Sequence, residues 1–243
     1  MSLGKSVVSV VPLVVGLSVC MGILSACMAS MAGVVWFGVL LLVSLVLWWV
    51  EDGLESVSGV VGSGFVDVVA WGVILFISSE ALFFLGALVS GLYLLEEGWK
   101  EAWVAMDFSS TPLWISVVLL SSGVSVTQFH ESLMTGYSAK AGLWMGVTVL
   151  LGFGFLMIQF EEWSEILFSA STGVGGGVFF FITGFHGLHV VVGSLLNLGV
   201  WFGVWLGAKR AVGEPKVEGV IWYWHFVDVV WLFVLLGLYW LMM

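Results

Sequence analysis

The chain has 243 residues, of which 61% are hydrophobic and only 9% are charged. Soluble domains carry about 25% charged residues, so this composition excludes a soluble globular domain and indicates an integral membrane protein. The formal net charge is -10, and only six Lys and Arg residues are available to meet phosphates, which excludes nucleic acid as a partner.

The charge-free stretch from Ser6 to Val50 predicts two membrane-spanning helices. As one helix it would extend about 68 Å, more than twice the ~30 Å hydrocarbon core of a bilayer. The chain must therefore turn within it. The small residues SACMASMAG (25–33) predict the position of that turn.

Five more apolar stretches follow, separated by polar or glycine-rich loops. Proline is common at the first position of a helix, and Pro112 opens the second of these stretches. Acidic EEWSE (161–165) and glycine-rich STGVGGG (171–177) predict the loop before the fourth. The sequence therefore predicts an all-α integral membrane protein with seven spans in a single membrane domain, residues 1–243. The last five spans are expected at about 66–95, 112–130, 143–160, 178–206 and 220–241.

The distribution of cations agrees with seven spans. Five of the six Lys and Arg residues then fall on the side of the N-terminus, as the positive-inside rule expects. This pattern predicts an N-terminus inside and a C-terminus outside. The five are Lys5, Lys140, Lys209, Arg210 and Lys216, and Lys100 lies opposite.

Small residues at four-residue spacing predict close contacts between helices. Gly199, Gly203 and Gly207 repeat along one face of the sixth span, and Gly142 and Gly146 do so in the fifth. Such spacing allows two helix backbones to approach closely in a membrane.

Glu80, in ILFISSEALFFLG (74–86), is expected close to the midplane of the third span. A charge there costs at least ~2.5–3.5 kcal/mol on insertion scales. Three roles remain open: a neutral carboxylic acid bonded within the bundle, a group that relays protons, or a contact with lipid or another subunit. Ser78 and Ser79 are candidate hydroxyl partners for the first role.

Two pairs of polar residues occur at a spacing of three in the last two spans. His225 and Asp228 share one helix face, either as a polar pair that holds the helix against a neighbour or as an Asp that fixes a His tautomer. His186 and His189 share a face as well. A closed metal site needs three or four ligands and the chain has four His in all, so we expect no metal site and no redox centre in this chain.

Five segments resemble the signature blocks of cytochrome c oxidase subunit III, in the haem-copper oxidase subunit III family, and they occur in the same order. The resemblance covers about residues 31–241. It maps the family's polar intramembrane positions onto Glu80, His130, Glu162, Glu165, His186, His189, His225 and Asp228. The segments are ILFISSEALFF (74–84), LLSSGVSVTQFHESLMTG (119–136), LMIQFEEWSE (156–165), FFFITGFHGLHVVVGS (179–194) and WYWHFVDVVWLFVLLGLYW (222–240).

This resemblance implies two groups of helices, helices 1–2 at about 7–50 and helices 3–7 at about 66–241, around a V-shaped cleft that holds phospholipids. It implies that the chain itself binds no haem or copper, and that haem a and copper lie in partner subunits. The chain is expected to pack mainly on subunit I, to meet subunit II and accessory subunits, and to support oxygen reduction coupled to proton pumping. It is thus part of an enzyme, within complex IV and its respiratory supercomplexes.

The resemblance also suggests residues for lipid contact, together with a departure from the family pattern. Trp48, Trp49, Glu55, Lys209 and Arg210 are the candidates. The family has two arginines after the Trp pair, whereas this chain has Val50 and Leu54. Since an arginine fork is a good phosphate ligand, the effect of this loss on lipid binding stays open.

Location and electron donor complete these expectations. Seven spans in a compact chain favour a mitochondrial inner membrane, with the N-terminus in the matrix and the C-terminus in the intermembrane space; a bacterial plasma membrane is the alternative. Subunit III of a quinol oxidase is the nearest rival, since these motifs separate cytochrome c from quinol poorly. A stand-alone proton channel or transporter that uses Glu80 and Asp228 is the rival from another class.

Overall fold

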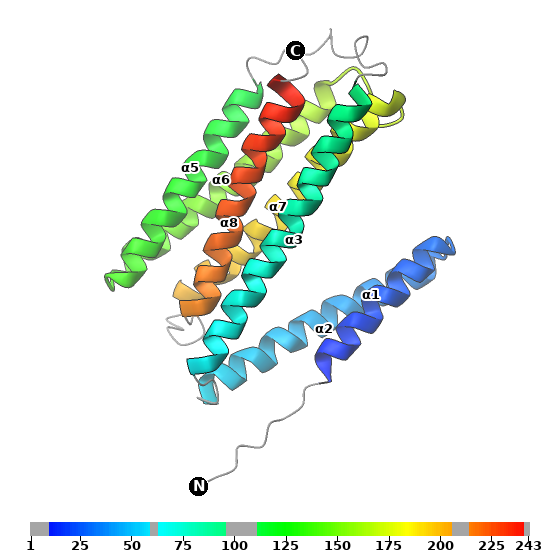
Figure 1. Ribbon diagram of the computed structural model, residues 1–243. Helices are drawn as coiled ribbons and strands as arrows, with labels where there is room; N and C mark the ends of the chain where they lie inside the picture. Colours follow the sequence, from blue (N-terminus) through cyan, green and yellow to red (C-terminus); the bar gives the residue numbers. More distant parts are fainter. Residues whose placement is uncertain (1–9, 59–62, 96–110, 206–213, 241–243) are drawn as a thin grey trace. The chain divides into compact units, whose positions relative to one another are not determined.

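The computed structural model describes residues 10–58, 63–95, 111–205 and 214–240. All the regular secondary structure of these residues is helical, which confirms the predicted all-α class with seven helices (Figure 1). The helices are α1 (Val11–Cys27), α2 (Met31–Ser58), α3 (Ser63–Leu95), α5 (Thr111–Met134), α6 (Ser138–Glu165), α7 (Gly173–Trp205) and α8 (Glu214–Val234). A π-helical segment, Leu235–Trp240, continues α8.

Among the described residues, five helices are long and apolar enough to cross a membrane. α1 and α2 contain shorter apolar stretches, Leu13–Gly22 and Met31–Ser44. The chain is therefore a multi-pass membrane protein. The five spans are Ala70–Leu94, Thr111–Met134, Ser138–Glu165, Gly173–Trp205 and Lys216–Tyr239.

The chain divides into two compact units, Met1–Val66 and Asp67–Met243. The first unit holds the hairpin of α1 and α2. Its turn lies between Cys27 and Met31, inside the predicted stretch 25–33. Near the turn, a Cβ atom at Gly33 would lie 2.6 Å from Ser25 Oγ, so glycine is needed for the two helices to approach so closely.

The second unit contains α3 and the bundle of α5, α6, α7 and α8, which lie side by side in Figure 1. Only 11% of the apolar window of α3 is buried, compared with 50% for α7 and 56% for α8. α3 therefore lies at the edge of this unit. The largest fully buried side chains come from the other four helices, among them Phe129, Phe155, Phe179, Trp224 and Trp231.

Several predicted boundaries are wrong. Its charges placed acidic EEWSE in a loop, but it forms the end of α6, as the resemblance to the end of the family's fifth helix implies, and Glu162 there is buried. The glycines at 173, 175, 176 and 177 were expected before a helix but lie in the first turns of α7. Gly176 packs against the Ser169 carbonyl there, at a distance that leaves no room for a Cβ atom.

The glycine spacings are confirmed in the fifth span and wrong at Gly199. Trp201 of α7 donates from Nε1 to the Gly142 carbonyl at 2.9 Å. A Cβ atom at Gly146 would lie 3.1 Å from the same nitrogen. Gly199 is exposed, and a Cβ atom there would meet nothing within 4 Å. Gly207 lies outside the described residues.

Candidate functional site

The carboxylate of Glu80 on α3 meets His189 on α7. Glu80 Oε2 lies 3.2 Å from His189 Nε2, and the Glu80 side chain is 24% exposed. The expectation that Ser78 and Ser79 serve as its partners is wrong. Their hydroxyls donate to backbone carbonyls of α3 itself, at residues 74 and 76.

The second nitrogen of His189 fixes the number of protons in this pair. His189 Nδ1 lies 2.8 Å from the Phe185 carbonyl. A carbonyl only accepts hydrogen bonds, so Nδ1 carries a hydrogen. A hydrogen bond between Nε2 and Glu80 then requires one proton in this contact, either on the carboxyl in a neutral pair or on the imidazole in an ion pair. In both forms the pair has no net charge, which suits a membrane interior.

Aromatic rings surround His189. Its ring centroid lies 4.6 Å from that of Phe185, 5.2 Å from Phe84, 6.1 Å from Tyr223 and 6.3 Å from Phe226. These rings come from α3, α7 and α8. They surround the imidazole with apolar carbon, where a hydrogen-bonded contact is stronger than in water.

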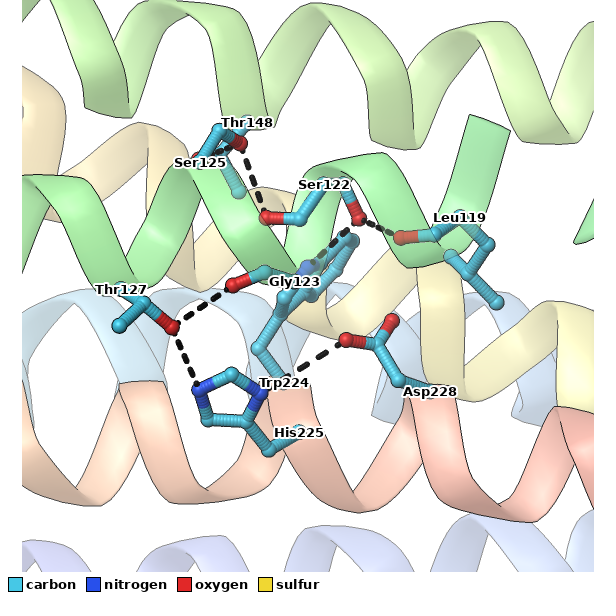
Figure 2. A network of polar contacts seen from close by, with 9 residues as sticks. All are labelled: Leu119, Ser122, Gly123, Ser125, Thr127, Thr148, Trp224, His225 and Asp228. Carbon is cyan, nitrogen blue, oxygen red and sulfur yellow. Dashed lines mark hydrogen bonds and ion pairs between the residues drawn. The ribbon is translucent and has the colours of Figure 1, made fainter. Parts of the chain in front are cut away.

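His225 and Asp228 of α8 face α5 (Figure 2). His225 Nδ1 lies 3.8 Å from Asp228 Oδ2, and His225 Nε2 lies 3.4 Å from Thr127 Oγ1. The Thr127 hydroxyl donates to the Gly123 carbonyl at 2.9 Å, so it can only accept from His225. This arrangement favours a hydrogen on Nε2 and turns Nδ1 toward the carboxylate.

Asp228 lies against the backbone of Gly123. Asp228 is 6% exposed. The Oδ2 atom of its carboxylate occupies the space that a Cβ atom at position 123 would need. Position 123 therefore has to be glycine as long as Asp228 keeps this rotamer. Figure 2 shows the two residues facing each other across α5 and α8.

Two tryptophans extend this polar seam between α5 and α8. Trp224 donates from Nε1 to Ser122 Oγ at 3.0 Å, and Trp231 donates to Ser116 Oγ at 2.9 Å. Both indoles are fully buried. Since buried indole N–H groups need an acceptor, the serines of α5 fix how α8 lies against α5.

Glu162 forms a third buried carboxylate cluster at the end of α6. Gln159 donates from Nε2 to Glu162 Oε2 at 2.7 Å, and the Tyr239 hydroxyl donates to Oε1 at 3.0 Å. Glu162 is 7% exposed. Tyr239 comes from the π-helical segment, a rare geometry that is often found at functional sites.

The other predicted site residues differ in burial and surroundings. His186 lies in the core, 5.6 Å from the Phe155 ring and 5.0 Å from the Trp231 ring. His130 is half-buried near the end of α5, and Glu165 is exposed. Of the lipid candidates, Trp48, Trp49 and Glu55 lie in α2 but their side chains are not among those described, and Lys209 and Arg210 lie outside the described residues.

The predicted pair His186 and His189 is separated by the fold. His189 turns toward Glu80, whereas His186 turns toward α6 and α8. Within the described ranges, no group of three or more His, Cys, Asp or Glu side chains is arranged to hold a metal ion.

Sequence reasoning missed the partners that complete these contacts. The signal for the α5 partners was the run of hydroxyl residues in LLSSGVSVTQ (119–128), which contains Ser122 and Thr127. For Glu162, the i and i+3 spacing from Gln159 was a local signal, whereas no local pattern pointed to Tyr239, which lies 77 residues away along the chain.

Comparisons with known proteins agree on one family. A sequence model of the family described as "Cytochrome c oxidase subunit III" matches residues 4–243. Cytochrome c oxidase subunit 3 of Polypterus ornatipinnis is 40% identical over 178 residues, which cover 70% of this chain and 68% of the relative. The same subunit of Squalus acanthias is 38% identical over 210 residues, covering 83% and 80%, and that of Oncorhynchus mykiss is 35% identical over 239 residues, covering 90% and 92%.

Proposed function

This chain belongs to the cytochrome c oxidase subunit III family, and from the contacts of its helices we propose its role in the oxidase. It is subunit III of respiratory complex IV, a multi-pass membrane component of the electron transport chain. The single observation that carries this conclusion is the family match over residues 4–243. A quinol oxidase is not favoured, since the relatives are subunits of cytochrome c oxidase.

We place the redox chemistry in partner subunits. Haem a and copper belong to those partners, and this chain packs mainly on subunit I, with further contacts to subunit II and accessory subunits, also within supercomplexes. The apolar outer face of α3 supports such packing, since large side chains on it are exposed. Examples are Trp71, Leu75, Leu82, Leu85 and Tyr93.

The chain also binds phospholipids in this proposal. An apolar groove of about 520 Å³ between α3 and α7 supports it, with a width set by the small residues Gly86, Ser90 and Gly91 and walls that include Phe83 and Phe181. An acyl chain suits such a lining. Independently of this groove, Trp48, Trp49, Glu55, Lys209 and Arg210 are our candidates for contact with phospholipid head groups on the side of the N-terminus.

The intramembrane polar residues have two roles. We assign Glu80, with His189 as its partner, to a proton-holding pair within the membrane. His225 and Asp228 hold α8 in the bundle, and Glu162 holds the π-helical segment. His130, Glu165 and His186 are structural polar residues in this proposal.

Purification tests the assignment. A tagged chain extracted in mild detergent should bring down a large catalytic subunit and show the reduced-minus-oxidised spectrum of haem a. A dinuclear copper site in the accompanying subunit II identifies cytochrome c as the donor. Recovery of a haem-free homo-oligomer that moves protons in liposomes would instead identify a stand-alone channel.

Location and orientation are tested separately. We place the chain in the mitochondrial inner membrane, with the N-terminus in the matrix, because five of its six cations then lie on the matrix side. In mitoplasts, a tag at the C-terminus should be cleaved by added protease, and a tag at the N-terminus should be protected. The reverse result would contradict this orientation.

A further inference from the structure

Three residues on α7 carry buried polar atoms that no protein group reaches within the part of the chain that the structure describes. These atoms are both ring nitrogens of His186, the hydroxyl of Ser194, and the amide nitrogen and oxygen of Asn197. All three residues are 0% exposed. A polar group in an apolar interior is costly unless it is hydrogen-bonded. Among the described residues, no protein group meets this need for the five atoms.

The three residues lie on one side of α7. Ser194 and Asn197 follow His186 by eight and eleven residues, which on an α-helix places all three within an arc of about 80°. This side faces the interior, since the His186 ring contacts those of Phe155 on α6 and Trp231 on α8. The polar atoms thus form a row inside the bundle, about 17 Å long along the helix axis.

The packing around Gly187, the residue that follows His186, is loose. Gly187 is buried, yet a Cβ atom at this position would meet no atom within 4 Å apart from its two chain neighbours and its own helix backbone. The opposite holds around Ser194, where a Cβ atom at Gly152 of α6 would lie 2.7 Å from Ser194 Oγ. The open space is therefore local and lies at the position that follows His186 in the chain.

Other kinds of partner do not suit these atoms. Lipid and partner subunits are excluded because the side chains have no exposed surface within this chain alone. A cation is disfavoured because imidazole, hydroxyl and amide groups supply no negative charge here. The indole face of Trp231 can accept a hydrogen bond from one N–H of His186. The second ring nitrogen of His186 is then still unpaired.

We propose that the interior of the second unit binds internal water molecules at His186 and at Asn197. A neutral imidazole and a carboxamide each offer both donors and acceptors, and water satisfies both kinds at once. Folded proteins hold about one buried water per 27 residues, each bonded to otherwise unpaired polar groups. This inference does not depend on the function proposed above.

The direct test is a structure of the intact oxidase complex at a resolution that shows ordered water. We expect density at about 2.7–3.2 Å from a ring nitrogen of His186 and from the amide of Asn197. Well-ordered side chains with no such density would overturn the proposal. So would side chains that have rotated to bond protein groups instead.

X-ray hydroxyl-radical footprinting of the complex gives an independent test, because bound water forms radicals next to the side chain that holds it. His186 should be oxidised several-fold faster than Phe129, which is also 0% exposed.

Variants at position 187 test whether this labelling depends on the open space there. G187L fills the space and should lower the oxidation rate at His186 to that of Phe129. If the G187L complex does not assemble, the smaller G187A replaces it. G199L, at an exposed and open position of the same helix, should leave the rate at His186 unchanged. A protected His186 in the unmodified complex, or a rate that filling position 187 does not lower, would refute the site.

Discussion

The indole ring of Trp224 lies directly against the backbone of Gly193, where a Cβ atom would lie 2.7 Å from Cε3 of the ring. The ring cannot easily withdraw, because its Nε1 donates to Ser122 on α5 and its far edge meets Gly152 on α6. One side chain of α8 thus sets its distance from three neighbouring helices at once.

Gly193→Ala should loosen the subunit. The added methyl group overlaps the ring, and overpacking of this kind typically costs about 1–3 kcal/mol. Thermal release of the subunit from the purified complex should therefore occur at a lower temperature. Gly199→Ala on the same helix is the matched control, since nothing lies within 4 Å of its Cβ position. Equal release temperatures for Gly193→Ala and Gly199→Ala would show that the close contact of Trp224 with Gly193 does not contribute to stability.

Gly123→Ala should destabilise the seam between α5 and α8, because Asp228 occupies the space of the new methyl group. In an Asp228→Ala background the same change should be tolerated. The double-mutant cycle should give a coupling of about 0.5–3 kcal/mol, measured as subunit retention against denaturant. Additive effects would mean that Asp228 does not pack on Gly123 in the complex.

A hydrophobic carbodiimide should modify Glu80 at neutral pH. The side chain is partly exposed at the edge of the second unit, and in the neutral form of the pair it carries the proton that this reagent needs. Glu80→Gln should abolish labelling and leave oxidase activity largely intact. Glu162→Gln is the control that should keep the label, because Glu162 is buried. Loss of all activity in a normally assembled Glu80→Gln complex would give Glu80 an obligatory catalytic role.

Tyr239→Phe should weaken the end of the bundle. The change removes a hydroxyl that donates to the buried Glu162, and leaving such an acceptor short of a donor costs about 1–3 kcal/mol. A lower temperature of thermal unfolding is expected, with partial recovery in Tyr239→Phe/Glu162→Gln. Tyr93→Phe, at a position 74% exposed, should have little effect. If Tyr239→Phe and Tyr93→Phe lowered the unfolding temperature by similar amounts, that result would argue against the contact between Tyr239 and Glu162.

Helix class and approximate spans are predictable here because hydrophobic length is a local property of the chain. The turn after α1 and the start of α5 at Thr111 follow from small residues and Pro112. EEWSE is different, since its charges suggest a loop while Glu162 is paired within the core. Local composition cannot show that a distant tyrosine will meet it.

Partners of the intramembrane residues are harder to predict, because they depend on the register between helices. Ser78 and Ser79 looked suitable for Glu80, yet a serine in a helix easily donates to the carbonyl one turn before it, as both do here. The partner observed for Glu80 is His189. Similarly, i and i+3 spacing joins His186 to His189 on paper, although the two rings face different neighbours.

The contact between Glu80 and His189 has a consequence for biogenesis. The two residues lie 109 positions apart, and at about 5–20 residues per second a ribosome needs roughly 5–20 s to reach the second after the first. α3 is therefore complete while its partner helix is still unmade, and during this interval Glu80 is without its contact to His189. A nascent chain arrested before α7 would display that lone carboxyl to lipid, which is a feature that membrane quality control can recognise.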